Sequence, residues 1–155
     1  MEEKNIGFRV RILKLEELSV EDRELRHAAI RAAGCAYAPY SHFKVGAAVL
    51  LEDGTILEGN NQENIAYPSG LCAERVALFS AGASFPDVPI VALAIIAMKN
   101  GEIQPSISPC GGCRQVVLET ERRYGCSVRV LLCGRNDTVI VPSAKDLLPL
   151  SFIEI

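Results

Sequence analysis

The sequence lacks the features of membrane-bound and secreted proteins. Its longest uncharged apolar run, Val88 to Met98, is too short to cross a bilayer. The first residues, Met1 to Lys4, include two acids, whereas a signal peptide begins with basic residues and continues with an apolar run. These absences predict a cytoplasmic protein without a membrane partner.

Concentrated positive charge and low-complexity tracts are also missing. The 155 residues carry a formal net charge of −3, and basic residues cluster only at Arg122-Arg123. Proteins that bind long nucleic acids need a basic stripe along the surface. The charge therefore predicts no nucleic-acid partner and favours a small neutral substrate. Because 49% of the residues are apolar, we expect a folded core.

The order of apolar segments predicts a single α/β domain over residues 1–155, in which residues 1–19 form a lead segment. A helix is expected to begin at Ser19 and to end before Pro39, and further helices are expected at residues 72–81, 110–124 and 143–148. Strands are expected at residues 44–51, 56–59, 90–98, 127–132 and 138–141, with a possible edge strand at 8–12. Asp53-Gly54 indicates an antiparallel hairpin, and strand–helix–strand connections indicate parallel pairing. Together they predict a mixed five-stranded sheet with helices on its faces.

The six cysteines are expected to be reduced, since no secretory signal precedes them. Three are predicted to be small buried hydrophobic residues: Cys35, Cys126 and Cys133. The other three stand at the beginnings of two expected helices: Cys72, Cys110 and Cys113. Helix N-termini stabilise thiolates, which are the form that a metal binds. Three thiolates would hold zinc and leave its fourth position for water, whose pKa then falls to roughly 7.

Two residues next to Cys72 fit the same site. Glu74 can share it with Cys72 only where a helix begins, because residues two apart diverge in the middle of a helix. Arg75 is the candidate cation that would offset the charge of three thiolates. Taken alone, Glu74 could be an ordinary acid of a first helical turn, and Arg75 a surface arginine.

The cysteines also allow two other interpretations. Cys110 and Cys113, separated by two glycines, could form a redox pair. A structural zinc site would need a fourth ligand, for which the candidates are Cys126, Cys133, His27 and His42. Both interpretations predict a protein that is not an enzyme.

The segment Cys72-Ala73-Glu74-Arg75, followed by Ser108-Pro109-Cys110-Gly111-Gly112-Cys113-Arg114-Gln115, resembles the small zinc-dependent cytidine deaminases. Cysteine as the first ligand is typical of the branch that acts on free nucleosides. Further matching segments are residues 37–48, 61–67 and 148–152. The resemblance implies a three-layer α/β/α fold and a homotetramer whose sites lie near subunit interfaces.

The resemblance also implies a role for each matching residue. One zinc ion per subunit would be bound by Cys72, Cys110 and Cys113. Glu74 would be the catalytic proton shuttle, and Arg75 would temper the charge of the thiolates. The residues expected to contact the substrate are Phe43, Asn61, Glu63, groups around Ala73, and Phe152 from a neighbouring subunit. Phe152 could equally be a core residue of its own chain.

These roles predict hydrolysis of cytidine and deoxycytidine to uridine and deoxyuridine, as in pyrimidine salvage. Glu63 suits neutral sugar hydroxyls and would repel a nearby 5′-phosphate, so nucleosides are favoured over nucleotides. A blasticidin-type deaminase remains an alternative, because it has the same zinc signature.

Overall fold

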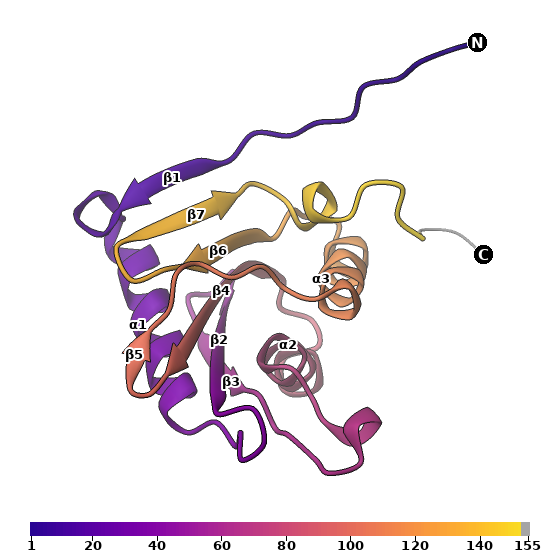
Figure 1. The fold of residues 1–155 in the computed structure, drawn as a ribbon. Helices are drawn as coiled ribbons and strands as arrows, with labels where there is room; N and C mark the ends of the chain where they lie inside the picture. Colours follow the sequence, from indigo (N-terminus) through magenta and orange to yellow (C-terminus); the bar gives the residue numbers. More distant parts are fainter. Residues whose placement is uncertain (153–155) are drawn as a thin grey trace.

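The computed structural model describes residues 1–152 and contains a mixed sheet that carries three helices (Figure 1). The strands are β1 (Arg11–Lys14), β2 (Phe43–Leu51), β3 (Ile56–Asn60), β4 (Ile90–Lys99), β5 (Glu102–Ile103), β6 (Arg129–Cys133) and β7 (Asp137–Val141). The helices are α1 (Val20–Gly34), α2 (Ala73–Ser84) and α3 (Gly111–Tyr124). Three short 3₁₀ turns are η1 (Leu15–Glu17), η2 (Tyr67–Ser69) and η3 (Ala144–Leu147).

The sheet has the strand order β1-β7-β6-β4-β2-β3, and β5 pairs with the end of β4. Only β4 and β6 run parallel among the described strands, so the predicted mixed sheet is confirmed. The predicted number of five strands is wrong, because the described residues form seven. The expected edge strand at 8–12 exists as β1, shifted to Arg11–Lys14. Strand β5 returns from a turn at Asn100-Gly101, where both residues have positive φ.

Alternate residues of the strands build a separate core on each face of the sheet. Ala47 and Val49 pack in one cluster with α2 and α3, whereas Ala48 and Leu50 pack in the other with α1. Figure 1 shows α1 on one side of the sheet and α2 and α3 on the opposite side. This period of two is what a strand covered on both faces produces.

Two glycines allow the helices to approach the sheet closely. A Cβ atom at Gly46 would lie 2.0 Å from the carbonyl oxygen of Ala29 in α1. A Cβ atom at Gly59 would lie 2.4 Å from the amide nitrogen of Ala77 in α2. Such distances are far inside van der Waals contact, so both positions require glycine at the present helix–strand spacing.

The helix boundaries follow most of the local signals. The Ser19 hydroxyl accepts a hydrogen bond from the Asp22 amide at 3.0 Å, and Gly125 ends α3 with φ of 66°. The predicted end of the second helix at Ala81 is wrong, since α2 continues to Ser84. The last predicted helix is the 3₁₀ turn η3. None of the helices in residues 1–152 is long and apolar enough to cross a membrane.

Candidate active site

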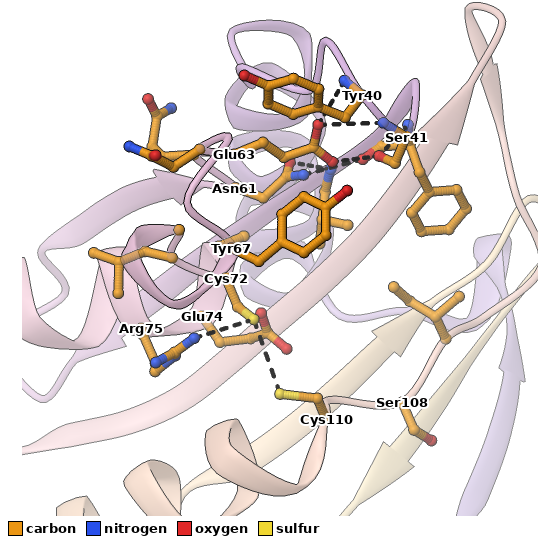
Figure 2. A pocket seen from close by; sticks show the side chains of 18 residues that line it. Tyr40, Ser41, Asn61, Glu63, Tyr67, Cys72, Glu74, Arg75, Ser108 and Cys110 are labelled. Carbon is orange, nitrogen blue, oxygen red and sulfur yellow. Dashed lines mark hydrogen bonds between the residues drawn. The ribbon is translucent and has the colours of Figure 1, made fainter.

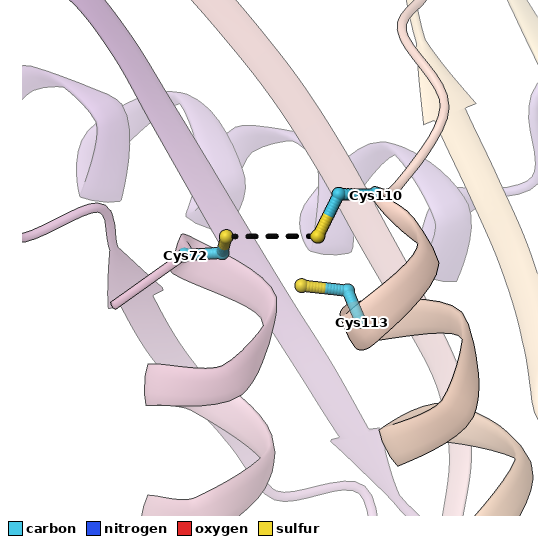
Figure 3. A group of neighbouring side chains, drawn as sticks. All are labelled: Cys72, Cys110 and Cys113. Atoms are coloured by element: carbon cyan, nitrogen blue, oxygen red, sulfur yellow. Dashed lines mark hydrogen bonds between the residues drawn. The ribbon is translucent and has the colours of Figure 1, made fainter. Parts of the chain in front are cut away.

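Helices α2 and α3 begin side by side, and three cysteine sulfurs converge between their N-termini (Figure 3). Cys72 and Cys110 are the N-cap residues of the two helices, and Cys113 lies in the first turn of α3. The three sulfur atoms lie within 4.8 Å of one another, and those of Cys72 and Cys110 are 3.9 Å apart. Zn–S bonds of about 2.3 Å in a tetrahedron require sulfurs about 3.8 Å apart, so the residues present fit zinc.

The group of potential ligands contains three members. Within residues 1–152, no further cysteine, histidine, aspartate or glutamate joins it. The candidates for a fourth ligand, Cys126, Cys133, His27 and His42, therefore do not close the site. Three protein ligands with an open fourth position are typical of catalytic rather than structural zinc.

The thiols differ in their readiness to ionise. Burial raises the pKa of Cys110, but hydrogen bonds with Cys113 and Cys72 together outweigh this effect and hold the pKa below its ordinary value. Burial and the nearby Glu74 charge raise the pKa of Cys113. Without a cation the cluster thus resists carrying several negative charges at once. A divalent metal would favour the thiolates, and its binding would release protons.

Glu74 and Arg75 stand beside the sulfurs, as Figure 2 shows. The Glu74 side chain is buried, and this burial raises the pKa of its carboxyl group. A guanidinium nitrogen of Arg75 donates to the Cys72 sulfur at 3.6 Å. Arg75 therefore faces the cluster, as the sequence predicts, and is not merely a surface arginine. Its Nε atom is buried without a hydrogen-bond partner in the described residues.

The cluster lies at a cavity of about 670 Å³. Among the predicted site residues, its lining contains Phe43, Asn61, Glu63, Ala73, Glu74, Arg75, Cys72 and Cys110. It also contains residues for which the sequence predicted no role, including Tyr40, Ser41, Tyr67, Leu71, Ile107 and Ser108. Tyr40 and Ser41 lie within the matching segment 37–48, which was the available signal for them. A nucleoside is small enough for a cavity of this size.

Asn61 and Glu63 are held in fixed orientations on the cavity wall. The Asn61 side chain accepts a hydrogen bond from the Val45 amide at 2.7 Å and donates to the Phe43 carbonyl at 3.0 Å. The Glu63 carboxylate accepts hydrogen bonds from the Ser41 hydroxyl and from the amides of Tyr40 and Ser41. The hydrogen bond from the Ser41 side chain lowers the pKa of Glu63. The wall therefore presents an ionised carboxylate next to a rigid amide.

Phe152 does not line this cavity. Its side chain is 69% exposed, which excludes the core role considered for it, and its carbonyl accepts a hydrogen bond from Gln115 at 3.0 Å. Of the cysteines predicted to be buried, Cys133 is buried, Cys126 is half-buried and Cys35 is exposed. The prediction for Cys35 is wrong because this residue lies at the end of α1, beyond the part that packs on the sheet.

Residues 19–126 match the family model for the cytidine and deoxycytidylate deaminase zinc-binding region. The chain belongs to this deaminase family. Its metal is therefore zinc, and the alternative of a zinc or thiol module without catalytic activity is set aside. Residues 1–18 lie outside the matched region.

Members of the deaminase family resemble the chain over most of its length. It is 45% identical to a cytidine deaminase of Sporosarcina psychrophila over 140 residues, which are 90% of this chain and 92% of that one. It is 46% identical to a cytidine deaminase of Halalkalibacterium halodurans over 80% of this chain and 88% of that one. The crystal structure of cytidine deaminase from Burkholderia pseudomallei superposes with a TM-score of 0.72 and 42% identity, covering 83% of this chain and 97% of that one.

Proposed function

We propose that this deaminase hydrolyses cytidine and deoxycytidine to uridine and deoxyuridine and releases ammonia. The observation that carries the proposal is the position of Glu74, a buried carboxyl group beside three convergent cysteine sulfurs at the cavity. The high similarity to cytidine deaminases supports the same substrate class. One water molecule adds to the base and one ammonia leaves, so the reaction needs a nucleophile and proton transfers but no oxidant.

We assign the zinc ligands to Cys72, Cys110 and Cys113. Bound zinc would supply Lewis acidity and lower the pKa of water at the open coordination position. Arg75 would balance part of the thiolate charge through its contact with Cys72. The N-termini of α2 and α3 favour the same negative charge.

Glu74 would move the protons of the reaction. Its carboxylate would take a proton from the attacking water and deliver it to N3 of the base. A second proton would pass by the same carboxyl group to the departing amine, because acid and base roles alternate. Burial raises the pKa of Glu74, and this shift makes the carboxyl group a better base and easier to reprotonate.

The cavity wall would select the sugar. Asn61 and Glu63 would bind the ribose hydroxyls, Phe43 would pack against the nucleoside, and groups around Ala73 would contact the base. The ionised Glu63 disfavours a phosphate placed close to it, so we expect little activity on CMP. The fixed hydrogen bonds of Asn61 and Glu63 support this assignment because preorganised groups need not reorder on binding.

Assembly and location are proposed on the family resemblance. We propose a homotetramer in which Phe152 reaches the cavity of a neighbouring subunit, in the cytoplasm. The large exposed fraction of Phe152 and its anchoring by Gln115 support this role.

The test is loss of the cytidine ultraviolet band together with ammonia release by the full chain, compared with deoxycytidine, CMP and blasticidin S. We expect turnover of both nucleosides and little of CMP or blasticidin S. Glu74→Gln should lower turnover by orders of magnitude and keep its zinc, whereas Glu119→Gln, on the exposed face of α3, should leave both unchanged. Efficient deamination of CMP would contradict the proposed substrate, and a fully active Glu74→Gln variant would remove Glu74 from the mechanism.

A further inference from the structure

Residues 1–10 form an N-terminal arm that leaves the sheet at β1 and extends away from the rest of the molecule (Figure 1). The whole arm is exposed, and its residues make no hydrogen bond within the described part of the chain. Large apolar side chains recur at every second position from the arm into β1, at Ile6, Phe8, Val10 and Ile12, with exposed fractions of 41% to 65%. In an extended chain this spacing places them on one face.

Strand β1 is the last strand of the sheet. It pairs with β7 along one edge, and its other edge has no strand partner in residues 1–152. An exposed edge strand offers a row of backbone donors and acceptors to another chain. The arm continues this strand, so the free backbone and the apolar stripe belong to one extended segment, residues 2–14.

We propose that residues 2–14 pair antiparallel with the same residues of a second copy of this chain, about a two-fold axis at Phe8. The contact adds a strand to each sheet edge by main-chain hydrogen bonds, and the surface is self-complementary as a two-fold interface requires. The proposal does not depend on the catalytic function, because the arm lies outside the region that the deaminase family model matches.

The sequence of the arm favours this register. With the axis at Phe8, the two Phe8 rings face each other, and Ile6 lies opposite Val10 twice. Glu2 of each copy then lies opposite Lys14 of the other. Aromatic, aliphatic and opposite-charge pairs across neighbouring strands each stabilise a sheet by about 0.2–1 kcal/mol.

Neighbouring registers are less favourable. An axis at Gly7 would place two residues of the apolar stripe, Val10 and Ile12, opposite charged residues, whereas the axis at Phe8 places only Ile12 of the stripe opposite one, Lys4. An axis at Arg9 would place this arginine opposite its own copy, and like charges in that position destabilise a sheet. An axis between two residues would put the two apolar stripes on opposite faces of the ribbon.

The remainder of each molecule fits this arrangement. In the proposed register, residues 11–14 of one copy lie opposite residues 2–5 of the other. The two paired arms form a two-stranded antiparallel ribbon. The folded part of each copy therefore joins this ribbon at the opposite end, and on the opposite edge, from the folded part of the other copy. Each arm projects away from its own body in Figure 1, which leaves its length free for the second strand.

Site-directed disulfide formation tests the register. Phe8→Cys places two thiols across the axis, within the range that a disulfide spans. Gly7→Cys is the matched control, because its two thiols would lie on residues with Cα atoms about 8 Å apart, beyond that range. After mild oxidation of the full chain, peptide mapping separates these bonds from any made by the native cysteines.

We expect about tenfold more cross-linked dimer for Phe8→Cys than for Gly7→Cys, given this difference in distance. Equal yields, or a higher yield for Gly7→Cys, would overturn the proposal. Hydrogen exchange of the native sequence gives a second readout, in which every second amide of residues 2–10, namely those that face the partner strand, should exchange slowly and lose this protection in Phe8→Asp. Exchange of all amides in residues 2–10 at the rate of an unstructured peptide in the native protein would equally overturn it.

Discussion

Helix α2, which carries Cys72 and Glu74 at its beginning, is positioned by its close contact with Gly59 in β3. A Cβ atom at Gly59 would lie 2.4 Å from the Ala77 amide nitrogen and 2.7 Å from the Ala73 carbonyl oxygen. Ordinary contacts of a Cβ atom begin at 3.4 Å, so Gly59→Ala requires the helix and strand to separate by roughly 1 Å. The atoms in the way are backbone atoms, which no side-chain rotation can move.

The expected cost is large for both stability and activity. Overpacking of this kind lowers the free energy of unfolding by about 1–3 kcal/mol. A displacement of about 1 Å at the first turn of α2 also moves Cys72 and Glu74 away from the cysteines at the start of α3, and such a misplacement can lower turnover by about 100-fold. Urea unfolding and steady-state turnover of cytidine measure the two effects.

Gly82→Ala is the matched control for this substitution. A Cβ atom at Gly82 would approach only a guanidinium nitrogen of Arg123, at 3.0 Å, and that flexible side chain can move. Because Gly82 lies inside α2, alanine should stabilise the helix by about 0.5–1 kcal/mol. The reasoning is refuted when Gly59→Ala unfolds at the same urea concentration as the native chain and keeps full turnover.

Two further predictions concern buried and lining side chains. The Glu121 carboxylate accepts hydrogen bonds from Ser143 and from the amides of Val128 and Ala144, so Glu121→Gln should lower the free energy of unfolding by about 2–4 kcal/mol. Urea unfolding measures this loss, and an unchanged midpoint would contradict it. Ser41→Ala removes the hydroxyl that orients Glu63 but leaves the amide hydrogen bonds, so the KM for cytidine should rise about threefold to tenfold with little change in kcat. A fall in kcat at unchanged KM, in steady-state kinetics, would place Ser41 in another role.

Residues that cap helices or form turns made many boundaries of the helices and strands predictable from the sequence. Ser19 and Gly125 mark helix ends through hydrogen bonding and backbone conformation that depend on near neighbours. The missed strand β5 had a local signal too, because Asn-Gly at residues 100–101 favours the positive φ values of a hairpin turn. By contrast, Ser143 does not cap a regular helix, since its hydroxyl donates to the distant Glu121. That contact depends on tertiary packing and left no mark in the local sequence.

The residues of the candidate site also divide into those that a local sequence pattern predicts and those whose position depends on tertiary packing. The spacing of Cys110 and Cys113 and the position of Cys72 at the start of a helix predicted one cluster, and the structure brings the three sulfurs together. Ile107 was missed because it reaches the cavity from a loop, whose path depends on packing rather than on residue periodicity. The role of Phe152 stays a prediction, because its proposed contact lies in another subunit.

Metal analysis of cysteine variants tests the central claim most directly. We predict about one zinc per chain in the native protein, as expected for a catalytic site with three protein ligands, and the same content in the control Cys126→Ser. Cys72→Ser, Cys110→Ser and Cys113→Ser should each lose most of the metal. A full complement of zinc in any of these three variants, or its loss from the control, would contradict the assignment of the site.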